Sequence, residues 1–317
     1  MQRQEKLIQN RMESSDKMGE IKLSPFSVNE VKETIPYLIP KGIMTINIDN
    51  MWDKGIYGKG VTVAIIDTGC DVNHICLKDR IIGTKNFTSE GSGNDVTDFI
   101  GHGTHVAGTI AGNRNTNGIT GVAPECNLLI IKVLDSQGNG SYQNLINAIN
   151  YAIDNKVDII NMSLGGSKDD DNLHNAIKKA IDVGISVVVA SGNEGDKLFD
   201  TEEWSYPGGY QEVIEVGAIS QDMNVADFSN TNKYIDLVAV GQDVTSCYPN
   251  NKYAKMDGTS MATPHVAGSL ALIKEWFRKE FNREPSEMEL YANLIKCTKT
   301  LNISRNAQGN GYIYFNE

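Results

Sequence analysis

A serine between small residues stands out because its surroundings suit a nucleophile. Residues 258–268 read Gly-Thr-Ser-Met-Ala-Thr-Pro-His-Val-Ala-Gly, so Ser260 stands at the start of a helix-forming run. Small neighbours expose the hydroxyl, and the N–H groups at a helix N-terminus favour developing negative charge. A capped core helix, with Thr259 or Ser260 as the cap, would give the same pattern. This segment alone leaves both interpretations open.

Two further segments supply the partners that a nucleophilic serine needs. An apolar run over residues 61–66 ends in Asp67, and His102 follows Gly101 at the start of a second helical pattern. Such a run is typical of a buried parallel strand, and open α/β sheets place their active sites at the carboxyl ends of these strands. In a proton relay the serine attacks, the imidazole takes and returns its proton, and the carboxylate holds the imidazole. We therefore expect Ser260, a histidine and Asp67 to work together.

A fourth segment offers a donor for an oxyanion. Residues 188–195 read Val-Val-Ala-Ser-Gly-Asn-Glu-Gly and end a strand with Asn193. Its amide could hydrogen-bond an oxyanion together with the backbone N–H of Ser260. Ser-Gly-Asn is also a common turn, and spacing alone does not distinguish His102 from His105 as the base.

Together these segments resemble the signature blocks of the subtilisin-like serine proteases. The blocks Asp67-Thr-Gly, His102-Gly-Thr-His, Ser191-Gly-Asn193 and Gly-Thr-Ser260-Met-Ala occur in the order known for subtilisin. The likeness covers roughly residues 52–312. The chain resembles the intracellular subtilisins of Gram-positive bacteria more closely than other subtilisins, because its residues 18–26 are similar to the short leader of that group. The resemblance implies a three-layer α/β fold, with a mostly parallel central sheet and helices on both faces. It selects His102 as the base and Asn193 as the oxyanion donor, and it leaves His105 and His265 as structural histidines.

The resemblance also assigns residues to the substrate and to a calcium ion. Two edge segments should hold an extended peptide by strand addition, and they are formed by Gly138, Asn139, Gly140, Ser163, Leu164 and Gly165. A loop over residues 113–119 matches the calcium loop of the family, with candidate ligands Asn113, Asn115, Asn117 and Ile119. The family usually adds a carboxylate from a His-Pro-Asp-Leu segment, but here that segment is His-Ile-Cys-Leu and Cys76 replaces the aspartate. Because a thiol is a poor calcium ligand, we expect this site to be weakened or absent.

The chain divides near residue 48 into an N-terminal extension, residues 1–48, and a subtilisin-like catalytic domain, residues 49–317. Residues 21–48 hold three of the eight prolines and show no helical period, which indicates extended chain. We hypothesise that residues 18–48 form an inhibitory pro-segment, with residues 23–26 or, as a second candidate, residues 35–38 across the cleft. Proline lacks an N–H and fixes φ, so it can bind while it holds the backbone out of line for attack. A disordered tail is the alternative, and a chain that begins near residue 45 should be more active if the hypothesis holds.

Beyond about residue 50, apolar segments alternate with amphipathic ones, which predicts a parallel sheet covered on both faces. Expected strands span residues 61–66, 127–133, 157–162, 185–190, 213–219 and 235–239. Expected helices span residues 103–112, 141–155, 171–183 and 259–280, and residues 286–317 should add one more helix and a final short strand.

Composition and charge limit the partners and the cellular compartment expected for the protein. A net charge of -11 over 317 residues argues against a nucleic-acid partner. Residues 1–20 lack the apolar stretch of a signal peptide, and no run approaches the ~18 apolar residues of a membrane span. The five dispersed cysteines form no CxxC pair and suggest reduced thiols and a cytoplasmic location. The expected partners are polypeptide substrates and the leader itself. Members of the intracellular group often form dimers, so the resemblance also allows a homodimer.

The sequence is compared with three functions: an esterase-like hydrolase, a catalytically silent peptide-binding protein and a serine endopeptidase. An esterase-like hydrolase usually carries a Gly-x-Ser-x-Gly elbow and the order Ser, Asp, His, and neither occurs around Ser260. A catalytically silent relative that binds peptides usually lacks a member of the triad, and none is missing. The sequence therefore favours a serine endopeptidase that forms an acyl-enzyme at Ser260.

Overall fold

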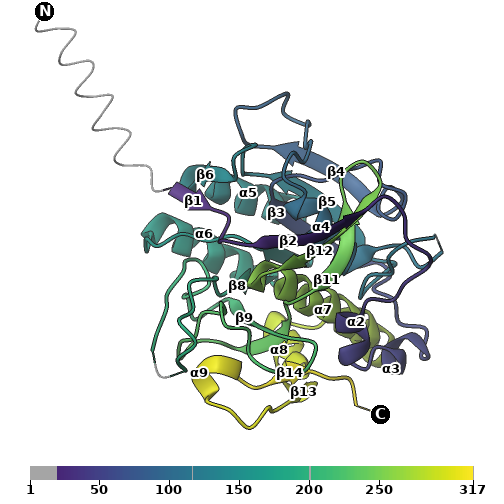
Figure 1. The fold of residues 1–317 in the computed structure, drawn as a ribbon, viewed down its shortest axis with the longest axis vertical. Helices are drawn as coiled ribbons and strands as arrows, with labels where there is room; N and C mark the ends of the chain where they lie inside the picture. Colours follow the sequence, from purple (N-terminus) through teal and green to yellow (C-terminus); the bar gives the residue numbers. More distant parts are fainter. Residues whose placement is uncertain (1–19, 116, 200, 317) are drawn as a thin grey trace, which may run out of the picture.

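The computed structural model describes residues 20–115, 117–199 and 201–316, and a nine-stranded sheet runs through this part of the chain (Figure 1). The strand order is β13-β14-β10-β9-β8-β7-β3-β5-β4. The strands are β3 (Thr62–Asp67), β4 (Ile81–Asn86), β5 (Asn127–Lys132), β7 (Ile159–Met162), β8 (Ser186–Ala190), β9 (Ile214–Ile219), β10 (Leu237–Val240), β13 (Thr298–Lys299) and β14 (Tyr312–Ile313). Neighbouring strands are parallel except β13 and β14.

Helices cover both faces of this sheet because alternate strand residues point in opposite directions. In β3, Val63 and Ile65 belong to one apolar cluster, and Ala64 and Ile66 belong to another. The first cluster lies under α4 (His102–Ala111) and α7 (Thr259–Phe281), which pack against each other. The second lies under α5 (Tyr142–Asp154) and α6 (Asp171–Asp182). The predicted three-layer α/β fold is therefore confirmed.

Local sequence accounts for where the outer helices begin. The Ser141 hydroxyl accepts a hydrogen bond from the Asn144 N–H at 3.1 Å and caps α5. The Asp170 carboxylate accepts the N–H groups of Asn172 and Leu173 at 3.0 and 3.1 Å and caps α6. These oxygens satisfy N–H groups that a helix cannot pair internally, so each helix starts within a residue of its expected position.

The prediction that residues 21–48 are extended throughout is wrong at their C-terminal end. The segment contains β1 (Glu20–Lys22) and β2 (Ser27–Lys32), but α2 (Lys41–Thr45) is helical, and α3 (Asp49–Trp52) follows it. The helix α2 begins after Pro40, whose φ of -58° suits a helix start. Ile43 is fully buried in the core, so tertiary packing decides the conformation of a segment too short to show a period.

The N-terminal strands extend two smaller sheets rather than the central one. The strand β1 pairs antiparallel with β6 (Asn139–Ser141), and β2 pairs antiparallel with β12 (Lys252–Asp257) of the hairpin β11 (Val244–Tyr248) and β12. Figure 1 shows β1 and β2 crossing the molecule beside β6 and β12. No local pattern in the sequence predicted β4, β11 or β12. The C-terminal part contains α8 (Glu287–Lys296), α9 (Arg305–Gln308) and two short strands, where we expected one helix and one strand.

Candidate active site

The structure places Asp67 and His102 in direct contact. Asp67 ends β3, and His102 opens α4. The Asp67 Oδ1 and His102 Nδ1 atoms are 2.8 Å apart, and both side chains are buried. A carboxylate on Nδ1 sets the tautomer, so that the His102 Nε2 atom carries the lone pair needed by a general base. Among the residues that the structure describes, this buried nitrogen has no hydrogen-bond partner.

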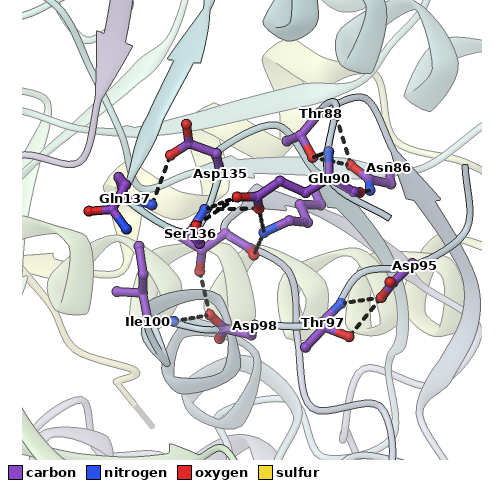
Figure 2. A network of polar contacts seen from close by, with 12 residues as sticks. Asn86, Thr88, Glu90, Asp95, Thr97, Asp98, Ile100, Asp135, Ser136 and Gln137 are labelled. Carbon is purple, nitrogen blue, oxygen red and sulfur yellow. Dashed lines mark hydrogen bonds and ion pairs between the residues drawn. The ribbon is translucent and has the colours of Figure 1, made fainter. Parts of the chain in front are cut away.

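A carboxylate that the sequence analysis missed joins the end of β3 to the first turn of α4. Asp98 accepts hydrogen bonds from the Thr68 hydroxyl at 2.9 Å, the Gly101 N–H at 2.8 Å and the Thr104 N–H at 2.9 Å. It also accepts the Ile100 N–H, as Figure 2 shows. These bonds fix the helix start that carries His102 relative to the strand end that carries Asp67. An acidic residue just ahead of a predicted helix was the available signal.

A buried lysine supports the same strand end from the other side. The Lys132 Nζ donates to the Thr68 carbonyl at 2.7 Å and lies 3.8 Å from a carboxylate oxygen of Glu90. Glu90 in turn accepts bonds from the backbone N–H and the hydroxyl of Ser136 (Figure 2). Burial lowers the pKa of Lys132, while Asp98 and Glu90 counter this effect. A lysine that closes an apolar strand was the signal for this residue in the sequence.

Ser260 lies in the first turn of α7, at the position expected for a nucleophile. Its hydroxyl donates to the Ser163 carbonyl at 3.1 Å, and the Ser163 hydroxyl donates to the Ser260 carbonyl at 3.0 Å. The ring of Phe26 packs edge-on against the His102 ring, with 5.1 Å between the centroids. In this structure Ser260 is thus turned toward Ser163, and an N-terminal residue covers the histidine.

The amide of Asn193 has a defined orientation. Its Oδ1 accepts the backbone N–H and the hydroxyl of Thr259, each at 2.8 Å. These two donors fix the oxygen, so the Nδ2 group points away from Thr259. It donates to the Pro25 carbonyl at 2.8 Å. An amide donor therefore meets a peptide carbonyl next to the residue that precedes Ser260.

The other two histidines of the signature segments are buried, as expected. A ring nitrogen of His105 lies 2.9 Å from the Val244 carbonyl, and a ring nitrogen of His265 lies 2.9 Å from the Met261 carbonyl. Burial lowers the pKa of His105 to about 3 and that of His265 to about 4. Both rings are therefore neutral near pH 7, and each is held by a backbone carbonyl.

Both predicted edge segments contact the N-terminal strand. The Leu23 N–H donates to the Gly138 carbonyl at 3.1 Å, and Lys22 exchanges two backbone bonds with Gly165, at 3.0 and 3.2 Å. In the β1–β6 ladder, Ile21 faces Gly140 and Lys22 faces Asn139. Ser163 contacts Ser260 instead, and the Leu164 side chain is buried in the core. An extended chain thus lies between the two segments, in the way that strand addition requires.

The residues expected to bind calcium make contacts of their own within the protein. The Asn113 Oδ1 accepts the Asn115 N–H at 3.0 Å, and Ile119 forms an isolated bridge with Leu38. The Asn117 carbonyl accepts the Tyr253 hydroxyl at 3.4 Å and lies 4.0 Å from the Cys76 sulfur. Calcium takes about six to eight oxygen ligands, usually with carboxylates among them. A thiol at the carboxylate position leaves this set poorly suited to a hard cation.

Comparisons with known proteins agree with this geometry. A family model described as "Subtilase family" matches residues 58–311. The chain is 52% identical over 299 residues to the "Major intracellular serine protease" of Bacillus subtilis (strain 168), covering 93% of each chain. It is 54% identical over 278 residues to the "Intracellular serine protease" of Paenibacillus polymyxa, covering 87% of this chain and 85% of the relative. It is also 45% identical over 241 residues to "Subtilisin DY" of Bacillus licheniformis, covering 76% of this chain and 85% of the relative. Within the part of the chain that the structure describes, no helix has the length and apolar character needed to cross a membrane.

Proposed function

The chain belongs to the subtilase family and is a serine protease, and from this premise we propose that it is an endopeptidase whose own N-terminal segment blocks its cleft. The Ser260 oxygen attacks the carbonyl carbon of a polypeptide, and the Ser260 proton passes to His102. His102 then gives that proton to the leaving amine, and water releases the acyl group from Ser260. Asp67 holds the imidazole and stabilises its charged form. Asn193 and the Ser260 N–H stabilise the oxyanion.

The observation that carries this proposal is the contact between Asn193 and the Pro25 carbonyl. The 2.8 Å bond places a peptide carbonyl at the amide that would stabilise an oxyanion. The residues just before it pair with both edge segments through Lys22 and Leu23. This is how an extended polypeptide would bind, so it supports both the substrate class and inhibition by the leader.

Three features of the leader support inhibition over cleavage. Phe26 packs on His102, and the Ser260 hydroxyl donates to Ser163 rather than to the histidine. Pro25 fixes its own φ and lacks an N–H, and we infer that this rigidity keeps the bond that follows it out of line for attack. When the leader leaves, the Ser260 hydroxyl can rotate toward the Nε2 atom of His102, which lacks a partner among the described residues.

The second candidate for the inhibitory contact lies elsewhere. Leu38 donates its N–H to the Gly118 carbonyl at 2.8 Å and accepts the Thr120 N–H at 3.0 Å. It therefore anchors the leader on the loop after α4 and not on the edge segments. The proposal rests on residues 20–26, and residues 27–45 act as the anchor.

The test compares the full chain with a chain that begins at Ser27, on an unfolded polypeptide substrate. A start at Ser27 keeps β2 and the buried Ile43, which a start near residue 45 would remove. The shorter chain should be the faster one, and the full chain should gain activity only as cleavage near residues 20–26 appears by N-terminal sequencing. Equal initial rates would refute inhibition by the leader. If neither chain is faster than a Ser260→Ala control, the endopeptidase assignment fails.

We also place the protein inside the cell, in the cytoplasm. Two of its relatives carry the word "intracellular" in their names. Fractionation of the native host should find the protein with cytoplasmic markers, and recovery in the culture medium of intact cells would contradict this placement.

A further inference from the structure

Two cysteines and a histidine that the proteolytic mechanism does not use meet in the interior. Each of His74, Cys76 and Cys247 offers one ligand atom, and these atoms all lie within 4.8 Å of one another. All three residues are 0% exposed. Ligand atoms around a tetrahedral zinc ion are about 3.5 Å apart, given bonds of about 2.0–2.3 Å, so modest side-chain rotation would close the cluster on a cation. The set belongs to the class that binds thiophilic metals.

The histidine is oriented as metal-binding histidines are. One ring nitrogen, Nε2, lies 3.0 Å from the Lys252 carbonyl. Since a carbonyl only accepts, Nε2 carries the proton and Nδ1 carries the lone pair. The lone pair now accepts the Cys76 N–H at 3.2 Å, at the long end of the range, so a cation would compete with a weak bond. The Tyr253 ring packs edge-on against His74, with 5.3 Å between the centroids, and restricts its tilt.

A fourth ligand is available from the strand that faces Cys247. Cys247 and Tyr253 are direct partners in the β11–β12 ladder, so their side chains share one face. The Tyr253 hydroxyl lies 3.5 Å from the Cys76 sulfur. Two sulfurs, one imidazole nitrogen and one hydroxyl oxygen would supply the four ligands that zinc usually takes, and the cluster contains Cys76, which replaces the carboxylate of the family calcium loop.

The net charge of the occupied site would differ between a zinc-class cation and calcium. Each thiol releases a proton to solvent on binding, so two thiolates cancel the charge of a divalent ion and leave a neutral site. Calcium, held only by carbonyl and amide oxygens of the loop, would keep its charge in the interior at a high desolvation cost. A cavity of about 560 Å³ is lined by Asn117, Asn251 and Tyr253, so it reaches the tyrosine that contacts Cys76.

We propose that His74, Cys76 and Cys247, with the Tyr253 hydroxyl, bind one zinc-class cation that replaces calcium as the structural metal of this protease. The ion joins the turn that carries His74 and Cys76 to the hairpin β11–β12. The strand β12 leads directly to the Ser260 segment and also pairs with β2 of the leader. The site therefore stabilises the segment that precedes Ser260. This inference does not depend on the proposed inhibition by the leader.

The test uses the full-length chain with Ser260→Ala, which removes self-digestion. Metal-free protein is titrated with Co²⁺ and Zn²⁺, and Co²⁺ should bind once per chain with a sulfur-to-cobalt charge-transfer band that Zn²⁺ abolishes. Zn²⁺ should raise the melting temperature of the metal-free protein, and Ca²⁺ should not. Cys76→Asp and Cys247→Ser each remove one of the two sulfurs, so each should lower the intensity of the band by about half or more and bind Zn²⁺ at least about tenfold more weakly. The matched control Cys126→Ser, at another fully buried thiol, should keep both properties.

A second measurement needs no variant at the cluster and covers the case in which those variants fail to fold. X-ray absorption of the zinc-loaded Ser260→Ala chain should show two sulfurs at about 2.3 Å and nitrogen or oxygen at about 2.0 Å. An all-oxygen shell, a band of undiminished intensity in both cluster variants, a disulfide between Cys76 and Cys247 in the purified chain, or stabilisation by Ca²⁺ alone would each overturn the proposal.

Discussion

Residues 20–26 of the leader dock through one fully buried side chain, Ile21, and truncating this side chain should activate the full-length enzyme. Ile21 is 0% exposed and packs in the core cluster beside Leu134 and Gly140. Ile→Ala changes in cores cost about 2–5 kcal/mol. At the edge of the molecule, where the neighbours can relax, we take the lower part of this range, about 2–3 kcal/mol. Since each 1.4 kcal/mol is a factor of about ten, the undocked fraction should rise roughly 30- to 140-fold.

The assay is the initial rate of the intact full chain on a fluorogenic peptide, with mass spectrometry to show that no leader has been cut. The Ile21→Ala rate should rise by the same factor as the undocked fraction, up to the ceiling set by the chain that begins at Ser27. Lys22→Ala is the matched control, because the Lys22 side chain is 62% exposed and its ion pair with Glu20 lies at the surface. Surface pairs contribute little, so this control should change the rate by less than about fivefold.

If the chain that begins at Ser27 is much faster than the full chain but Ile21→Ala is no faster than Lys22→Ala, docking does not depend on the buried isoleucine. Contacts other than that of Ile21 would then hold residues 20–26 in the cleft.

Three further predictions concern the site and its support. In the chain that begins at Ser27, Asn193→Ala should lower kcat by a factor of about 10²–10³ with little change in KM, because one oxyanion donor is lost. Steady-state kinetics measures both constants, and an unchanged kcat would contradict this role. Lys132→Met should lower the free energy of unfolding in urea by about 1–3 kcal/mol, because the Thr68 carbonyl loses its side-chain donor and Glu90 loses a cation. An unchanged urea midpoint would show that the buried cation contributes nothing. Burial raises the pKa of Glu215 to about 8 in the folded chain, whereas its usual pKa is near 4.5. Between these two pH values the carboxyl group is protonated in the folded state and ionised in the unfolded state. Stability should therefore fall between about pH 5 and 8 by up to about 1.4 kcal/mol per pH unit, and Glu215→Gln should flatten this slope; parallel slopes in unfolding curves would refute it.

Much of the fold follows from the sequence because its central strands are buried on both faces. Strands such as β8, with five buried residues in a row, appear as apolar runs that need no knowledge of their neighbours. The strand β4 has mostly half-buried residues and lies at the sheet edge, so it lacks that pattern. The strands β2 and β12 exist because segments 220 or more residues apart pair, as Ala254 does with Val31, and no local period encodes such a pairing.

The site shows the same limit. Asp67, His102, Ser260 and Asn193 could be proposed from their segments, because each stands at the end of a strand or the start of a helix. The supporting residues Asp98 and Lys132 were missed because their roles depend on distances across elements and not on a motif. Cys76 is a visible departure from the family pattern in the sequence. Its proximity to Cys247, 171 positions later in the chain, follows only from the three-dimensional structure.

Asp67 holds His102, and residues 20–26 occupy the cleft. We therefore expect His102 to activate Ser260 once residues 20–26 leave. The most direct measurement is labelling with a serine-reactive organophosphate, located by peptide mapping. The chain that begins at Ser27 should take up one label per molecule at Ser260, the intact full chain should label much more slowly, and His102→Ala should abolish rapid uptake. Label on another residue, or rapid labelling of Ser260 that survives the loss of His102, would contradict the account.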